Sequence, residues 1–205
     1  RVCELARQIL PQTRQPLGPT VMLGEGSTDS RVLQSALNTL YPALADYFSF
    51  FNHTEFSVDG GAAYLVKFLK AFAAAQMSSR MIAVFDNDVA GVLAYEQACA
   101  LDLPQNIIVT RLPDIELGRS YPTVGPSGPA TLDVNGSAAG IELYLGREAL
   151  TLDEDLRPVR WTGYNSSAKK YQGEVEGKAD VLAAYLKQIN TYESPVIARK
   201  AFPEL

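Results

Sequence analysis

The sequence predicts an α/β fold with a mostly parallel sheet of about four strands and helices on both faces. Short apolar runs alternate with stretches of helical length and spacing over 20–112, as the crossovers between parallel strands require. Two of these runs stop abruptly at carboxylates beside glycine, where open α/β sheets bind ligands. With 205 residues and 47% apolar content, the chain can bury one such core.

The first predicted strand spans 20–23 and leads into a helix whose apolar residues recur at helical spacing. These residues are Val32, Leu33, Ala36, Leu37 and Leu40. Ser27 or Thr28 is expected to cap this helix, because a side-chain oxygen there accepts a hydrogen bond from a free backbone N–H. Pro42 cannot continue the helix far. The aromatic run 47–51 predicts the second strand.

The alternation continues beyond the second strand. Asp59, Gly60 and Gly61 form a turn signal that opens the next helix. The pattern then predicts, in order, a helix over 62–76, a strand over 81–85, a helix over 89–101 and a strand over 107–112. Right-handed connections between these strands complete the expected parallel sheet.

The character of the sequence changes after Pro113. Residues 114–140 are rich in Gly, Pro, Ser and Thr without sustained periodicity. We therefore expect a long loop or insertion there, which serves as a lid or a substrate-contacting arm. Helical spacing resumes over 141–150, a short strand is expected over 159–163, and 175–189 has the pattern of an amphipathic helix.

This organisation predicts one domain with appended segments. A helix or linker over 1–17 precedes a core over 18–113, and beyond the insertion 141–205 extends the same domain. The first residue is Arg1 rather than Met, which suggests a fragment of a longer protein. An additional domain or a partner protein is accordingly expected.

Composition narrows the functional classes. No apolar stretch reaches the roughly 18 residues of a membrane span and no signal-peptide pattern is present, so a cytoplasmic protein without a membrane partner is expected. Two cysteines, Cys3 and Cys99, are too few for a disulfide framework or a thiolate zinc site. The net charge of −5 does not indicate a polyanionic partner, although a bound divalent metal would reverse the local field.

Acidic residues follow the first and third predicted strands. Glu25 lies between two glycines with Asp29 just inside the following helix, and Asp86 and Asp88 follow the third strand. We expect these acids to converge at one sheet edge, where Mg²⁺ or Mn²⁺ would compensate their repulsion. A phosphate-binding P-loop does not fit, because no Lys or Arg occurs in the loop before Arg31. Taken singly, the first motif also fits an ordinary strand-to-helix turn, and Asp86 with Asp88 also fits a solvated acidic turn.

The two acidic motifs read Gly-Glu-Gly-Ser-Thr-Asp and Phe-Asp-Asn-Asp-x-Ala-Gly. They resemble the Toprim domain of topoisomerases, primases and OLD-family nucleases, and are most similar to OLD-like Toprim proteins of bacteria, including those linked to HEPN domains or phage defence. The resemblance covers roughly residues 18–115. It implies a Rossmann-like sheet and metal-dependent phosphodiester chemistry, in which Glu25, Asp86 and Asp88 bind one or two Mg²⁺ or Mn²⁺ ions and are catalytic.

The resemblance also implies further site residues. Asp29 matches the acid of the first motif, Glu142 takes the place of a later metal-binding acid, and Lys178 that of a catalytic lysine. Two metals about 4 Å apart would activate water and stabilise the leaving oxygen, while the lysine offsets phosphate charge. Both residues have an alternative interpretation. Glu142 would be an acid that the helix dipole favours near a helix N-terminus, and Lys178 would be an ordinary surface lysine. No tyrosine is marked as an activated nucleophile, so hydrolysis by water is expected.

Basic and aromatic residues are mixed in the last quarter of the chain. Arg160, Lys169 and Lys170 are candidate nucleic-acid-binding residues. The neighbouring aromatic residues are Trp161, Tyr164 and Tyr171. These rings could stack bases beside a basic groove, and ordinary packing or a solvated mixed-charge surface is the alternative.

The sequence therefore predicts a Mg²⁺- or Mn²⁺-dependent endonuclease that nicks or cuts nucleic acid, with DNA as the expected substrate. It would belong to a larger bacterial defence or repair protein, with a homo-oligomer as one option. Three alternatives stay open: a catalytically inactive Toprim-like module, a response-receiver-like binding module, and a phosphatase of the haloacid dehalogenase type. In that phosphatase class Thr or Val is expected where Ala90 stands. His53 is the only histidine, which leaves His-dependent triads little support.

Overall fold

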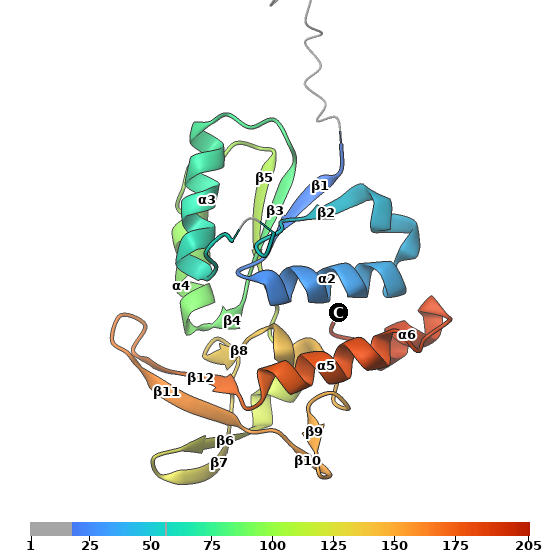
Figure 1. Ribbon diagram of the computed structural model, residues 1–205. Coiled ribbons are helices and arrows are strands. Elements are labelled where there is room, and N and C mark those ends of the chain that lie inside the picture. Colours follow the sequence, from blue (N-terminus) through green and yellow to red (C-terminus); the bar gives the residue numbers. More distant parts are fainter. Residues whose placement is uncertain (1–17, 56) are drawn as a thin grey trace, which may run out of the picture.

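The computed structural model describes residues 18–55 and 57–205, so the helix or linker expected over 1–17 and Cys3 lie outside the described residues. A four-stranded, all-parallel sheet is flanked by helices, consistent with a Rossmann-like α/β fold (Figure 1). The predicted fold class is confirmed. Within the described residues, no helix is long and apolar enough to cross a membrane.

The parallel sheet has the strand order β2-β1-β3-β5. Its elements, in chain order, are β1 (Thr20–Leu23), α2 (Ser27–Leu40), the 3-10 helix η1 (Pro42–Tyr47), β2 (Phe48–Phe50), α3 (Ala62–Ala74), β3 (Met81–Phe85), α4 (Val89–Cys99) and β5 (Ile107–Arg111). The first and third strands have their predicted bounds. Helices α3 and α4 end slightly before the predicted positions, and β2 is shorter than predicted.

Helices cover both faces of this sheet because its strands alternate their side chains. On β1, Leu23 packs into a core with Leu65 and Leu69 of α3, on the side where Figure 1 also places α4. Met22 points to the other face, where it lines a small cavity with Leu33 of α2. Helix α2 therefore lies across the sheet from α3 and α4.

Residues 114–140 were predicted to form a long loop or an insertion, and a long loop does not form there. This segment forms the 3-10 helix η2 (Leu117–Ser120) and the strands β6 (Tyr121–Gly125), β7 (Gly128–Leu132) and β8 (Ala138–Ala139). Alternate residues Tyr121 and Thr123 are buried, and Gly128 with a φ of 95° follows the tight β6–β7 turn. Strand alternation and a Gly-Pro-Ser-Gly turn were thus present in a segment whose composition resembles a loop.

The helix predicted over 141–150 is also wrong. Only the short 3-10 helix η3 (Ile141–Tyr144) forms there, and Gly146 has a φ of 88° that ends helical geometry. All residues of η3 are buried, including the acidic Glu142, so the run has no solvent-exposed face as an amphipathic helix would.

A second four-stranded sheet follows, with the order β12-β11-β6-β7. Its remaining strands are β11 (Val159–Asn165) and β12 (Lys170–Val175), and a small hairpin pairs β9 (Thr151–Leu152) with β10 (Asp155–Leu156). The helix predicted over 175–189 begins later, as α5 (Lys178–Ile189), because Val175 still pairs within the sheet. The terminal helix α6 (Pro195–Ala201) was not predicted.

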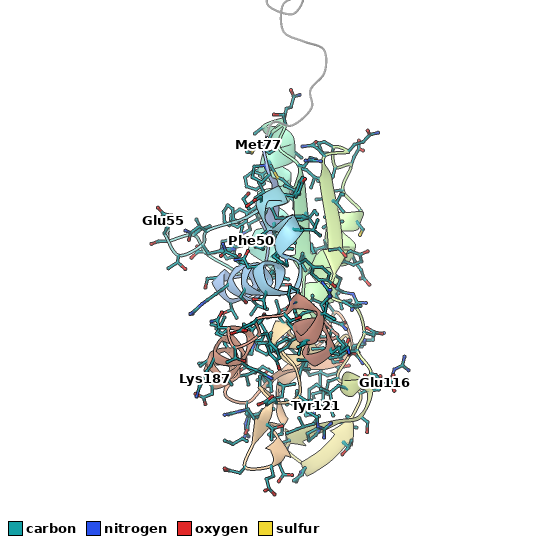
Figure 2. The ribbon with its side chains drawn as sticks, turned by 90° about the vertical axis from the view of Figure 1, so that its right-hand side faces the viewer. Phe50, Glu55, Met77, Glu116, Tyr121 and Lys187 are labelled. Carbon is teal, nitrogen blue, oxygen red and sulfur yellow. The ribbon has the colours of Figure 1, made fainter. Side chains whose placement is uncertain are left out.

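Helix α2 joins the two halves of the molecule. Its residues Val32 and Ala36 share one buried core with Tyr185 of α5 and with Phe202. The buried hydroxyl of Tyr185 lies 3.1 Å from the Ser35 Oγ of α2 and 3.4 Å from the Val32 carbonyl. In Figure 2 the half that carries the parallel sheet therefore stacks directly on the half that contains Tyr121.

Candidate metal centre

The first and third strands bring two acidic residues together. Strands β1 and β3 are parallel neighbours with Leu23 in register with Ala83, so the residues after them lie at one edge of the sheet. There the Glu25 Oε1 accepts a hydrogen bond of 2.9 Å from the backbone N–H of Asp86. The main chain of one acidic motif thereby orients the carboxylate of the other.

Asp29 turns back towards the same loop from the first turn of α2. It is buried, and its Oδ2 accepts a 2.8 Å hydrogen bond from the backbone N–H of Gly26, the N-cap residue. Capping by Ser27 or Thr28 was therefore a wrong prediction, because an acid three residues along takes the free amide. A Cβ on Gly24 would lie 2.6 Å from the Cβ of Asp29, so this approach requires glycine.

Asp86 precedes the short strand β4 (Asn87–Asp88), and Asp88 ends this strand at the start of α4. The Asp88 Oδ1 accepts a 2.7 Å hydrogen bond from the Gly91 N–H and caps that helix. A Cβ on Gly91 would lie only 2.3 Å from the backbone oxygen of Asp86. Glycine at this position lets the helix begin directly behind the acidic motif.

Asn87, between the two aspartates, is fully buried and holds the motif in place. Its Nδ2 donates to Asp114 Oδ1 at 3.0 Å and to the Pro113 carbonyl at 3.2 Å. Its Oδ1 accepts a 2.9 Å hydrogen bond from the Gly136 N–H and another from the Arg111 guanidinium. We did not predict this role from the sequence, although a polar residue enclosed by two acids at a strand end is a usable signal.

Glu142 and Lys178 join the acids from the C-terminal half. Glu142 is buried on η3 and faces the same point as Asp86, since a Cβ on Gly140 would lie 2.8 Å from Glu142 Oε2 and 3.5 Å from Asp86 Oδ2. The Lys178 Nζ, at the start of α5, lies 3.8 Å from Glu142 Oε1 and 3.3 Å from Glu174 Oε2. The structure thus brings both residues to the acidic cluster.

Burial and mutual repulsion raise the pKa values of the cluster. Burial raises the pKa of Glu25 from 4.5 to about 7, against a lowering by the Asp86 N–H. The pKa of Asp29 rises from 3.8 to about 6, again mainly through burial. The pKa of Asp86 lies well above its ordinary value through burial and then through the neighbouring carboxylates. Burial also raises the pKa of Asp88.

The charge of the cluster is only partly compensated. Burial lowers the pKa of Lys178, but Glu142 and Glu174 outweigh this effect, so the pKa is raised overall and the ammonium persists at neutral pH. Its single charge is shared between Glu174 and the five carboxylates of the cluster: Glu25, Asp29, Asp86, Asp88 and Glu142. A site of this composition favours an added cation that prefers oxygen ligands.

The acids do not form a ready-made ligand shell. Within the described residues, no three Asp, Glu, His or Cys side chains are arranged to hold one ion. Glu25, Asp29 and Asp88 each accept a hydrogen bond from a backbone N–H, which already uses part of their capacity to accept. Because Mg²⁺ usually keeps several waters and takes one or two carboxylates, this sparse donor set fits a hydrated hard cation.

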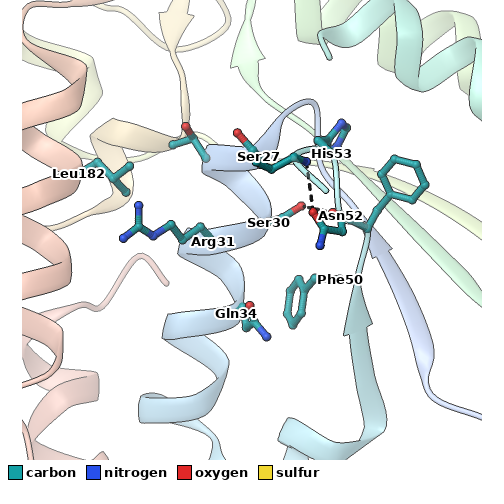
Figure 3. Close-up of a pocket in the computed structure, with 11 residues that line it drawn as sticks. Ser27, Ser30, Arg31, Gln34, Phe50, Asn52, His53 and Leu182 are labelled. Carbon is teal, nitrogen blue, oxygen red and sulfur yellow. Dashed lines mark hydrogen bonds between the residues drawn. The ribbon is translucent and has the colours of Figure 1, made fainter. Parts of the chain in front are cut away.

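A polar pocket lies beside the first turns of α2 (Figure 3). It encloses about 380 Å³, and its walls include Ser27, Arg31, Asn52 and His53. Both ring nitrogens of His53 are buried without a hydrogen-bond partner among the described protein atoms. The helical turns that carry Asp29 thus also present hydroxyl groups and a guanidinium to a polar ligand.

The three basic residues predicted to bind nucleic acid are not all together. Lys169 and Lys170 line a pocket of about 600 Å³ on the second sheet. Arg160 forms an ion pair with Glu176 and is not among the residues that line this pocket. The structure therefore groups the lysines and separates the arginine from them.

Comparison of the chain with models of protein families, with curated proteins and with solved structures found no match.

Burial of the acids and, after it, their mutual repulsion should make the metal-free protein less stable as the pH rises. The raised pKa of Glu25, about 7 against 4.5 when unfolded, favours the folded state fully below pH 4.5, and this advantage is lost as the pH rises through about 7. The loss due to Glu25 is on the order of 2–3 kcal/mol. Urea unfolding in EDTA across this pH range measures it. Glu25→Gln keeps the acceptor for the Asp86 N–H and should show a shallower fall, whereas an equal fall would refute this origin.

Gly91→Ala should destabilise the fold, because the new methyl group meets the backbone oxygen of Asp86 at 2.3 Å. The expected loss of unfolding free energy is about 1–3 kcal/mol, as for other overpacked sites. Urea unfolding at fixed pH measures it. Gly163→Ala is the control, since a Cβ there has no atom within 4 Å. Similar stabilities of the two variants would contradict close packing of α4 behind Asp86.

Proposed function

We propose that this protein is a metal-dependent nuclease of the Toprim type, which hydrolyses phosphodiester bonds of nucleic acid with Mg²⁺ or Mn²⁺. The observation that carries the proposal is the cluster at the carboxyl edge of the parallel sheet. There Glu25, Asp86 and Asp88, which have raised pKa values, lie together with the buried Glu142, and Lys178 contacts Glu142. In such a site the carboxylates bind a cation, and the ammonium group stabilises negative charge on the phosphate of the substrate.

Glu25, Asp86 and Asp88 would hold the cation, with Asp29 and Glu142 at its flanks. Hydrogen bonds from the main chain orient three of these carboxylates at the sheet edge before any cation binds. With pKa values of about 7 and about 6, Glu25 and Asp29 release protons readily near neutral pH. A bound Mg²⁺ or Mn²⁺ supplies the positive charge that activates water and stabilises the leaving oxygen.

Lys178 is suited to contact the substrate phosphate. Its ammonium is held between Glu142 and Glu174, and its raised pKa keeps it protonated at neutral pH. A fixed positive charge beside the acids offsets negative charge that develops on the phosphate in the transition state. Glu142 thereby positions the lysine as well as adding a carboxylate to the cluster.

The order of the acids along the chain favours the Toprim type over the enzyme alternative. A glutamate follows β1 and an Asp-x-Asp follows β3, and these strands are neighbours in the sheet. A phosphatase of the haloacid dehalogenase type places its Asp-x-Asp after the first strand. A response-receiver-like module needs a strand-end lysine, whereas Lys178 opens helix α5. DNA as the substrate, membership of a larger bacterial defence or repair protein, a cytoplasmic location and homo-oligomers stay predictions.

Glu25→Gln and Asp86→Asn should each lower cleavage by about 100-fold or more, because each removes a charge that would hold the cation. Supercoiled plasmid, linear DNA and RNA incubated with Mn²⁺ give the rates, and calorimetry gives Mn²⁺ affinity. Asp102→Asn, at an exposed acid, is the control for the same chemical change. Cleavage by either variant at the wild-type rate would sink the site assignment. Mn²⁺ binding without cleavage by the wild type would support an inactive module.

Lys178→Ala should slow cleavage by about 10–100-fold without weakening Mn²⁺ binding, since it removes a positive charge from beside the acids. Lys187→Ala is the matched control, because Lys187 lies on the same helix and is exposed. Initial cleavage rates and calorimetric Mn²⁺ titrations separate the two effects. A loss of Mn²⁺ binding in Lys178→Ala would instead give the lysine a role in holding the acids.

A further inference from the structure

The second sheet carries an aromatic pocket that the proposed reaction does not use. It encloses about 600 Å³, a size typical of ligand sites. Strands β11 and β12 and the turn between them supply the residues that give it its character: Trp161, Tyr164, Lys169, Lys170 and Tyr171. The β6–β7 hairpin closes its other side.

A β-bulge places the aromatic rings on one face. The register shifts between Trp161 and Gly163, whose partners Gly173 and Gln172 are consecutive on β12. In a regular strand, Trp161 and Tyr164 would point to opposite faces, because they are three positions apart. The extra residue of the bulge restores a common face, and both side chains line the pocket.

The rings are held firmly yet stay accessible. Tyr171 packs edge-to-face against both neighbours, with centroid distances of 5.2 Å to Tyr164 and 6.4 Å to Trp161. The indole of Trp161 sits between two glycines, where added Cβ atoms would lie 3.0 Å and 3.1 Å from it at Gly173 and Gly125. Tyr164 and Tyr171 are nevertheless 57% and 60% exposed. Their π-faces are thus available to a flat ligand.

The charged residues of the pocket favour an anionic ligand that extends towards the acidic cluster. Lys170 donates a 3.4 Å hydrogen bond to the Gly136 carbonyl, and the Gly136 N–H donates to Asn87, between the two cluster aspartates. The carboxylate of Asp133, which also lines the pocket, accepts hydrogen bonds from Asn135 within its own turn. The pocket is therefore connected to the acidic motif through two hydrogen bonds.

We propose that this pocket binds an unpaired base of a single-stranded nucleic acid, with Lys169 and Lys170 on the adjacent phosphates. Every base has a π-face that stacks on exposed tyrosine, and the lysines match the charge of the backbone. Paired bases in a duplex present only their edges, so they cannot enter such a pocket. The path of the strand towards the acids rests on the proposed function, whereas base binding itself needs no metal.

Binding of short fluorescent DNA strands tests the pocket directly. In EDTA, a single strand of about 12 nucleotides should bind at least tenfold more tightly than a duplex of that length or an abasic strand with the same phosphates. Tyr171→Ala and Tyr164→Ala should each weaken binding about tenfold, and Tyr171→Phe should retain it. Tyr47→Ala removes a tyrosine that is 64% exposed outside the pocket and should change nothing. Lys170→Ala should reduce the salt dependence of binding.

The outcomes separate this inference from the proposed nuclease. Any of three results would overturn the base pocket. The first is equal binding of abasic and normal strands, and the second is no binding in EDTA. The third is unchanged affinity in both tyrosine-to-alanine variants when these variants have wild-type melting temperatures. Cleavage in Mn²⁺ would in those cases still support the nuclease. Conversely, binding of the strand by the wild type in EDTA together with no cleavage in Mn²⁺ would support the base pocket and count against the nuclease.

Discussion

Repulsion among carboxylates crowded at one sheet edge is the constraint that the rest of this structure accommodates. Burial and neighbouring charges raise the pKa values of four acids, and the fold offsets part of this cost with main-chain donors. The N–H groups of Asp86, Gly26 and Gly91 each bind one carboxylate. Because these donors belong to the strand ends and helix starts themselves, the acids are oriented by the same backbone that builds the sheet.

Both halves of the chain are needed to complete the cluster. The parallel sheet supplies Glu25 and the aspartates, while Glu142 and Lys178 come from segments beyond residue 140. Helix α2 fixes their relative placement, because it bears Asp29 on its first turn and packs Val32 against the core that contains Tyr185. A change in that shared core would consequently alter the distance between the lysine and the acids.

The sequence was sufficient for regular strands and for acids placed next to them. Apolar runs bounded by Gly-flanked acids predicted β1 and β3, and their parallel pairing implied the meeting of Glu25 and Asp86. The sequence was insufficient where the local composition indicates one structure and tertiary contacts form another. The β6–β7 hairpin has the composition of a loop, and the segment after Gly140 is buried on all sides. The structural role of Asn87 was not predicted, because its hydrogen-bond partners lie 24 to 49 residues away in the sequence.

The charge distribution explains why a strand-binding surface would lie apart from the acids. A chain of net charge −5 with a carboxylate cluster repels nucleic acid, and a bound cation reverses this field only locally. Contacts that do not depend on overall charge are then needed to hold a strand. Stacking on Tyr164 and Tyr171 would be such a contact. Lys170 donates to the Gly136 carbonyl, and the Gly136 N–H donates to Asn87, the residue after Asp86. Under the proposed function, affinity for the strand and affinity for the cation would be set by separate residues on connected elements.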